Sequence, residues 1–192
     1  SSSLLGTADK KLTRISELKA LRAFYYFQMV QQYGAVPLVQ YSPDAQTEFP
    51  RTSVADVYAQ IITDLRSAGP GLAWRNTSQV GRATRAMAYH TLAKAYLTRG
   101  SAVTEARGQK PTDMDSAAVF ADSVITYSGH SLEADFGNLF SASYPNGKIP
   151  NLGEDGTPPV GDKAKSVLNN ASNEIIFAAE FSDNLNLASA NN

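Results

Sequence analysis

Aromatic side chains beside asparagines are the residues of this sequence with the clearest capacity for binding chemistry. An exposed tryptophan or tyrosine ring can stack on the C–H face of a sugar, while neighbouring amides bind the hydroxyl groups. Two such pairs, Trp74 with Asn76 and Tyr144 with Asn146, fall in predicted loops. Trp74 also follows Leu72 at the end of a predicted helix, a place more typical of packing. These four aromatic and asparagine residues are the candidates for ligand binding.

The sequence lacks the residue patterns that usually form catalytic and metal-binding sites. The chain has no cysteine, and its two histidines, His90 and His130, are not one helical turn apart as in zinc-binding helices. His90 falls in a predicted helix, and His130 follows Gly129 in a turn, where we expect it to face solvent. Phosphate-binding loops and nucleophile motifs are also absent. We predict no catalytic residue, no metal and no cofactor.

Asp113 and Asp115 are one of three acidic pairs in the sequence that could suggest a glycosidase, because that reaction uses two carboxylates on opposite sides of one bond. Proximity in sequence does not supply that geometry. Both residues stand where a helix is predicted to begin, and aspartate is favoured as a helix N-cap. We interpret the pair as capping residues.

The composition indicates a globular protein. The chain has 192 residues, of which 43% are hydrophobic and 18% charged, so it can bury a core. A net charge of −1 argues against a nucleic-acid partner and against an anionic membrane surface. No run approaches the roughly 18 apolar residues of a spanning helix. The sequence begins with serine, so a lipid anchor would lie outside this chain.

Two helices are predicted in the first third of the chain. The first covers residues 16–33 and ends where Gly34 can adopt a positive φ angle. Between residues 20 and 30 it is apolar except at Arg22 and Gln28, so we expect it to be central and buried on nearly every side. The second helix begins with Ser53 as N-cap, has the acidic residue of a capping box three positions later, and ends at the Gly-Pro-Gly sequence of residues 69–71.

Two further helices are predicted at residues 84–99 and 115–127. The first of these two is rich in alanine, which allows a neighbouring helix to approach closely. The second places five apolar residues on one face: Ala117, Phe120, Ala121, Val124 and Ile125. A surface loop is expected at residues 141–172 and a short strand at residues 174–181.

These elements predict a mainly α fold of stacked helical hairpins. Successive helix starts make each two-helix unit about twice the roughly 34 residues of a tetratricopeptide repeat, so the repeats would be irregular and interrupted by long loops. We expect residues 1–192 to form a single helical domain that belongs to a larger chain, since the predicted strand near its end has no obvious partner strand.

Four ordered motifs resemble the SusD/RagB family of nutrient-binding outer-membrane lipoproteins. The first is ELKALRAFYYF at residues 17–27 followed by YGAVPLV at 33–39, in which Ala35 replaces the acidic residue common in the family. The second is PRTSV at residues 50–54 with IITDL at 61–65. The third is GRAT at 81–84 with AKAYL at 93–97, and the weaker fourth is NEIIF at 173–177.

The resemblance implies a SusD-like helical protein with tetratricopeptide-like hairpins, anchored by lipid on the outer face of a Bacteroidetes-type outer membrane. It would cap a SusC-like TonB-dependent transporter and deliver a glycan or other nutrient to it without enzymatic turnover. Ligand contacts in the family generally come from variable loops, so the motifs transfer no binding residue to this chain. The alternative is a helical-repeat adaptor that binds a peptide or a protein.

Overall fold

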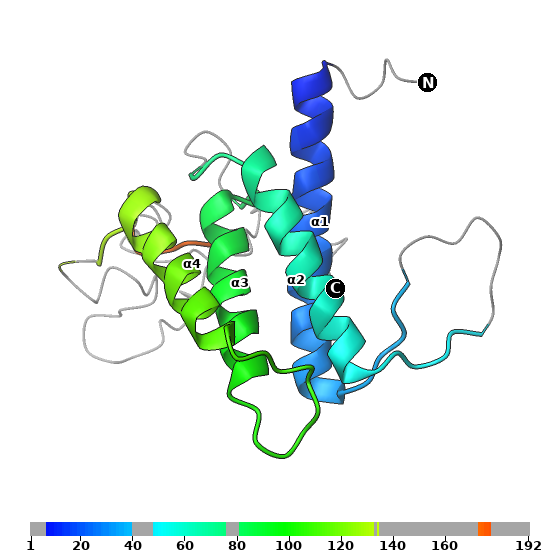
Figure 1. Ribbon diagram of the computed structural model, residues 1–192. Coiled ribbons are helices and arrows are strands. Elements are labelled where there is room, and N and C mark those ends of the chain that lie inside the picture. Colours follow the sequence, from blue (N-terminus) through cyan, green and yellow to red (C-terminus); the bar gives the residue numbers. More distant parts are fainter. Residues whose placement is uncertain (1–6, 40–47, 76–80, 133, 135–172, 178–192) are drawn as a thin grey trace, which may run out of the picture. The chain divides into compact units, whose positions relative to one another are not determined.

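The computed structural model describes residues 7–39, 48–75, 81–132, 134 and 173–177, which belong to two units, residues 1–128 and 129–192. The first unit contains helices α1 (Ala8–Tyr33), α2 (Val54–Ala68), α3 (Arg85–Gly100) and α4 (Asp113–Tyr127), and the short 3-10 helix η2 (Gly69–Gly71). Consecutive helices run in opposite directions, as in helical hairpins (Figure 1). The predicted mainly α fold is confirmed.

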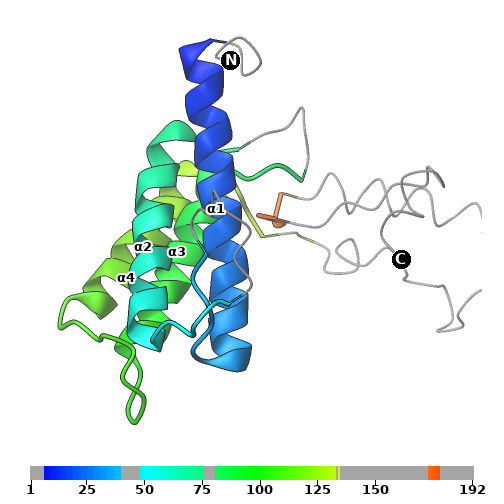
Figure 2. The same cartoon turned by 90° about the vertical axis from the view of Figure 1, so that its right-hand side faces the viewer.

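The four helices form an array in which each helix packs mainly on its neighbours in sequence. α2 lies between α1 and α3, and α4 packs on α3 (Figures 1 and 2). The helix η2 also contacts α1 and α3. The largest fully buried apolar side chains come from α1, α2 and α3: Phe27, Val57, Tyr58, Ile61, Leu65, Met87 and Leu92.

Helix α1 begins eight residues before the predicted start, because residues 8–15 contain good helix formers and neither glycine nor proline. It ends at Gly34, whose φ angle is +67°, as predicted. The expectation that residues 20–30 are buried on nearly every side is wrong. α1 is the first helix of the array, and among the described residues its helical neighbours lie on one side only, so Tyr25 is 62% exposed while Phe27 is 2% exposed.

Both predicted ends of α2 are confirmed. The Ser53 hydroxyl accepts a hydrogen bond from the Asp56 backbone N–H at 3.1 Å and donates one to the Asp56 carboxylate at 2.6 Å. At the other end the Gly-Pro-Gly sequence forms η2. The cap fixes where α2 starts relative to the preceding extended segment.

The segments on either side of residues 40–47 are hydrogen-bonded to each other. Val36 and Thr52 form an antiparallel bridge, with the Thr52 N–H donating to the Val36 carbonyl at 2.9 Å. The hydroxyl of Tyr26 accepts a hydrogen bond from the Val39 N–H at 2.8 Å. The two segments are therefore bound to each other, and the first of them is also bound to α1 through Tyr26.

Ion pairs join successive helices. The Arg22 guanidinium on α1 donates two hydrogen bonds, of 2.7 and 2.8 Å, to Asp64 on α2. Arg99 on α3 makes the same two-point contact with Asp113 on α4, at 2.5 and 2.9 Å. The Arg99 and Asp113 side chains are only 6% and 1% exposed, so this pair is isolated from water. A side chain at Gly100 would collide with Asp113, which explains the glycine.

Helix α4 differs from its prediction in two respects. It begins at Asp113 rather than Asp115, and Asp113 is not a cap, because its carboxylate is held by Arg99 and by the Lys110 N–H. The predicted apolar face is only partly buried: Ala117 and Val124 pack inward, but Ile125 is 78% exposed. α4 is the last helix of the array in the described part of the chain, so one side of it has no helical neighbour there.

The second unit is described at residues 129–132, 134 and 173–177. His130 does not simply face solvent, because its Nδ1 donates a hydrogen bond of 2.7 Å to the Asn173 carbonyl. Residues 173–177 are not in a strand, so the predicted strand is wrong over its described part, and residues 178–181 lie outside the described residues. The predicted loop at 141–172 also lies outside them. No described helix is long and apolar enough to span a membrane.

Candidate ligand-binding surface

Five aromatic rings from three parts of the first unit form one contiguous cluster, which we call the aromatic cluster: Trp74, Tyr89, Tyr96, Phe120 and Tyr127. The Trp74 ring centroid lies 5.5 Å from that of Tyr89 and 5.6 Å from that of Tyr127. Phe120 joins the two rings of α3, with centroids 5.0 Å from Tyr89 and 5.9 Å from Tyr96. These are the separations of interacting aromatic pairs.

The spacing of four of these rings along α3 and α4 determines which faces of the helices they occupy. Tyr89 and Tyr96 are seven residues apart on α3, and Phe120 and Tyr127 are seven apart on α4, so each pair shares one face of its helix. Gly69 allows Tyr89 to pack directly on the backbone of η2, because a Cβ atom at this position would lie 2.1 Å from the Tyr89 ring.

Arg85 holds the fifth ring in place. Its guanidinium lies over the Trp74 ring, 5.2 Å from the centroid, and donates hydrogen bonds to the carbonyls of Gly69 and Pro70 at 2.7 and 3.0 Å. The Arg85 backbone N–H donates to the Ala73 carbonyl at 2.7 Å. The loop that carries Trp74 is therefore fixed to the start of α3.

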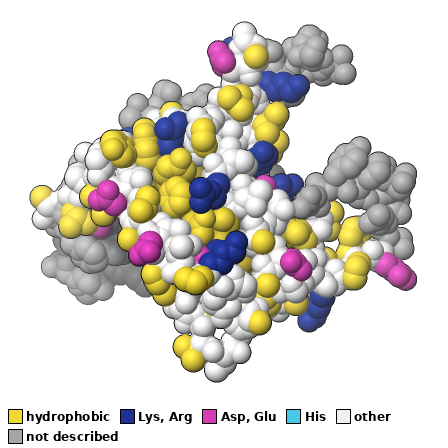
Figure 3. All heavy atoms as spheres, in the orientation of Figure 1, with side chains coloured by type: hydrophobic (Ala, Val, Ile, Leu, Met, Phe, Trp, Pro, Cys, Tyr) yellow, Lys and Arg dark blue, Asp and Glu magenta, His cyan; other side chains and the backbone are white. Residues whose placement is uncertain are grey.

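Exposure increases from one end of the cluster to the other. Tyr96 is buried, Trp74 and Phe120 are half-buried, and Tyr127 is 63% exposed. Arg66 of α2 lies over Phe120, 5.7 Å from its centroid, and donates a 2.9 Å hydrogen bond to the Tyr96 hydroxyl. Figure 3 shows hydrophobic side chains gathered between α2 and α4, with Lys and Arg side chains beside them.

This surface combines side chains that are able to contact a ligand. Tyrosine rings and a tryptophan supply flat apolar faces, and the arginines supply hydrogen-bond donors. Within the described residues no group of three or more His, Asp or Glu side chains could hold a metal ion. The acidic pair considered above is not arranged for glycoside hydrolysis, because Asp113 is buried in its ion pair while Asp115 is exposed.

The structure brings one of the four predicted candidates into this surface. Trp74 packs against Tyr89, Tyr127 and Arg85, whereas Asn76, Tyr144 and Asn146 lie outside the described residues. Tyr89 and Tyr127 were not among the predicted candidates, because both fall in predicted helices. The seven-residue spacing of aromatic residues on α3 and α4 was the signal that could have identified them.

The described fold and surface define a helical-repeat protein with an aromatic face. A family model described as "starch-binding associating with outer membrane" matches residues 4–97. A SusD-like protein P2 of Formosa agariphila is 33% identical over 134 residues, and a SusD-like protein of Bacteroides ovatus is 32% identical over 132 residues. The matches cover 66% and 68% of this chain. The chain belongs to the SusD/RagB family.

Solved structures agree with this assignment. A protein crystallised with a xylogluco-oligosaccharide is 31% identical and aligns with a TM-score of 0.60 over 70% of this chain and 27% of its own. A SusD superfamily protein from Bacteroides fragilis aligns over 93% of this chain and 32% of its own with a TM-score of 0.66, and at 22% identity this likeness shows the fold. The chain spans about a quarter of the length of the curated relatives it matches, 24% in both cases.

Proposed function

We propose that this chain is the helical part of a SusD-like protein that binds an oligosaccharide at the outer-membrane surface without chemically altering it. The observation that carries the proposal is the likeness to the structure determined with a xylogluco-oligosaccharide, which is 31% identical over 70% of this chain. The family description, starch-binding and associating with the outer membrane, supports both the ligand class and the location.

The exposed edge of the aromatic cluster is our proposed contact for the sugar. Tyr127 presents its ring to solvent, and Trp74 lies beside it at a tilt of 33° between the ring planes. The guanidinium groups of Arg66 and Arg85, which lie over Phe120 and Trp74 of the same cluster, are the proposed donors to the hydroxyl groups of a sugar stacked on Tyr127. Asn76, two residues after Trp74, is proposed as an amide contact, and Tyr144 with Asn146 as a second stacking pair.

Delivery to a SusC-like TonB-dependent transporter and a lipid anchor outside this chain complete the proposal. Delivery suits a protein that binds reversibly, because a ligand that is passed to a transporter must leave the binding protein unchanged. Among the described residues, acidic side chains are paired or dispersed instead of facing each other across a site. No cofactor is required for binding of this kind.

Replacing Tyr127 with alanine is expected to weaken oligosaccharide binding about fivefold, which corresponds to the roughly 1 kcal/mol that an aromatic contact contributes. Isothermal titration of the intact protein with a xylogluco-oligosaccharide measures the change. The matched control is Tyr33→Ala, since Tyr33 is 69% exposed at the end of α1, outside the aromatic cluster. Its affinity should equal that of the unaltered protein.

Different results would contradict the two parts of the proposal, which are oligosaccharide binding and its location at the aromatic cluster. If the unaltered protein binds and Tyr127→Ala and Trp74→Ala bind equally well, the function stands and the aromatic cluster is not its site. If neither the unaltered protein nor the controls bind any of a broad panel of glycans, the proposed ligand class is wrong.

A further inference from the structure

Two arginines at the aromatic cluster, Arg66 and Arg85, bind no carboxylate in the described part of the chain. Each guanidinium lies over a ring of the cluster. Their hydrogen bonds go to neutral oxygens, a tyrosine hydroxyl in the case of Arg66 and two backbone carbonyls in the case of Arg85. Arg66 is exposed and Arg85 is half-buried. Among the described residues, no negative charge therefore neutralises these two cations.

Three other arginines show the contrast. Arg22, Arg82 and Arg99 each bind both oxygens of one carboxylate on a different segment of the chain. These pairs join parts of the helical array, so their charges are used within the fold. The positive charges of Arg66 and Arg85 have no such use among the described residues.

The acidic side chains of the three helices around the cluster are directed away from it. On α2, Asp56 forms part of the N-terminal cap and Asp64 is paired with α1. Helix α3 contains no acidic residue. On α4, Asp115 and Asp122 each precede a ring of the cluster by five positions, which places them on a different face of the helix. The aromatic cluster is thus a positively charged surface.

We propose that the aromatic cluster selects an acidic oligosaccharide, in which a sugar residue carries a carboxylate or a sulfate group. This inference rests on the proposed function, oligosaccharide binding at the same cluster. A guanidinium presents parallel N–H donors that fit two oxygens of an anionic group, and such charged hydrogen bonds are roughly twice as strong as neutral ones. Both arginines keep N–H donors that no described residue accepts.

The distances within the cluster allow stacking and charge recognition by one ligand. The Trp74 ring lies between the two groups, with its centroid 5.6 Å from that of Tyr127 and 5.2 Å from the Arg85 guanidinium. A sugar residue stacked on Tyr127 therefore leaves Arg85 to the next residue of the oligosaccharide. Arg66 lies over Phe120, one ring further along the cluster from Trp74 and Tyr89. It can bind an anionic group on a more distant residue.

Isothermal titration of the intact protein with three forms of one ligand tests this proposal. The forms are a galactose-bearing xylogluco-oligosaccharide, the same molecule with its galactose oxidised at C6 to galacturonate, and the same molecule sulfated at that position. We expect a charged form to bind about fivefold more tightly than the neutral form, the effect of an exposed ion pair of about 1 kcal/mol. Added salt should reduce this preference, because it screens exposed charges.

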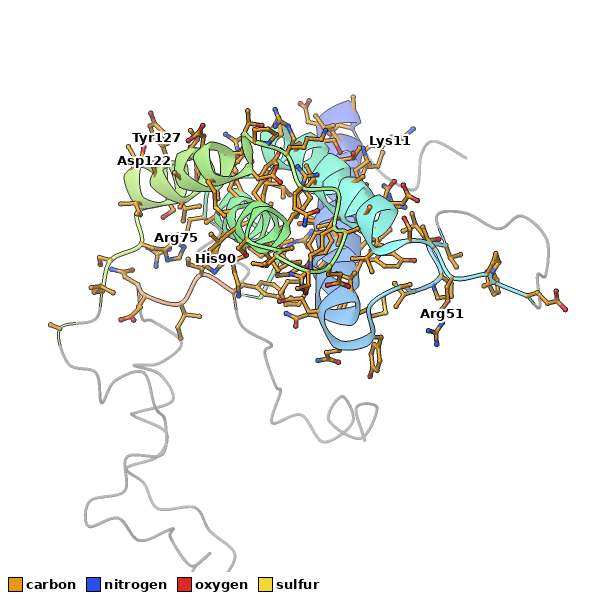
Figure 4. The ribbon with its side chains drawn as sticks, turned by 60° about the horizontal axis from the view of Figure 1, so that its bottom comes forward. Lys11, Arg51, Arg75, His90, Asp122 and Tyr127 are labelled. Atoms are coloured by element: carbon orange, nitrogen blue, oxygen red, sulfur yellow. The ribbon has the colours of Figure 1, made fainter. Side chains whose placement is uncertain are left out.

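Variants locate the preference on the cluster. Arg66→Gln removes one charge and should lower the preference to about twofold, whereas Arg66→Lys keeps the charge and should retain most of it. The matched control is Arg51→Gln, because Arg51 is exposed and lies at the opposite side of the array from Tyr127 (Figure 4). Its preference should equal that of the unaltered protein. Each preference is a ratio within one variant, so a general loss of binding does not imitate the effect.

Equal affinities for the neutral and both charged forms in the unaltered protein would overturn the acidic-ligand proposal and leave oligosaccharide binding intact. A preference that Arg66→Gln and Arg85→Gln both retain in full would also overturn it, because the charge would then be recognised elsewhere. If none of the three forms binds, oligosaccharide binding is contradicted and the acidic-ligand proposal with it. A preference for one charged form over the other supports the proposal and identifies the anionic group as carboxylate or sulfate.

Discussion

Replacing Asp113 with asparagine is expected to lower the free energy of unfolding by about 3–5 kcal/mol, because it leaves the buried Arg99 cation without its counter-charge. The carboxylate accepts two hydrogen bonds from Arg99 and one of 2.9 Å from the Lys110 backbone N–H. Both side chains of the pair are nearly inaccessible to water. Chemical denaturation followed by circular dichroism measures the loss.

A double variant distinguishes the cost of leaving one buried charge unpaired from the cost of changing the shapes of the two side chains. Arg99→Met combined with Asp113→Asn removes both charges, so it should cost less than the sum of the two single changes. The exposed pair between Arg107 and Glu105 provides the control, and Glu105→Gln should change stability by less than about 1 kcal/mol. An Asp113→Asn protein as stable as the unaltered one would show that the pair contributes nothing.

The same pair gives the stability a pH dependence. Burial raises the pKa of Asp113, but the hydrogen bonds from Arg99 and Lys110 outweigh it, so the pKa lies below its usual value. The folded state thus binds this proton less readily than the unfolded state, whose aspartate pKa is about 3.9. The contribution of Asp113 is fully present above that value and is lost as pH falls towards the folded-state pKa. Asp113→Asn should lack this part of the acid dependence.

Replacing Phe27 with alanine is expected to cost about 3–5 kcal/mol, because it opens a cavity between the first two helices. Phe27 is 2% exposed, and its ring meets that of Tyr58 on α2 edge to face, with centroids 6.4 Å apart. Since small domains are stable by only about 5–15 kcal/mol, the variant should be markedly easier to unfold in urea.

Tyr25→Ala is the matched control on the same helix. Tyr25 is 62% exposed, so its removal should change the unfolding free energy by about 0.5 kcal/mol or less. If the two variants were equally stable, residues 20–30 would not pack against α2 as described. If both were severely destabilised, the exposed side of α1 would have a partner.

The helices were predictable from sequence where local chemistry determines them. Ser53 caps α2 and Gly34 ends α1, as their types and positions indicated, because caps depend on a few adjacent residues. The start of α1 was missed, since its first eight residues are held by helix propensity and not by an obvious cap. Thr7, the residue at its N-cap, makes no side-chain hydrogen bond there.

Burial was less predictable than helix position, because it depends on what packs beside each helix. The apolar composition of residues 20–30 suggested a central helix, but α1 stands at one end of the array. Ile125 was expected inside for the same reason and lies outside. Asp113 was interpreted as a cap because its partner, Arg99, is fourteen residues away and the contact depends on how α3 and α4 pack.

The aromatic cluster was the least predictable feature. Trp74 was selected as an exposed ring beside an amide, but its surroundings come from α3 and α4. A cluster of this kind depends on the packing of three separate segments, which local sequence patterns do not reveal. The family motifs, by contrast, lie within the framework helices and the connections between them, so they identified the family without identifying a ligand contact.

Non-enzymatic glycan binding is tested most directly by titrating the intact protein with a xylogluco-oligosaccharide and then recovering the sugar for chromatography. We predict a saturable heat of binding and complete recovery of the oligosaccharide at its original length. Recovery of shorter sugars would contradict the absence of turnover, and the lack of any heat or mobility change with this and other glycans would contradict binding.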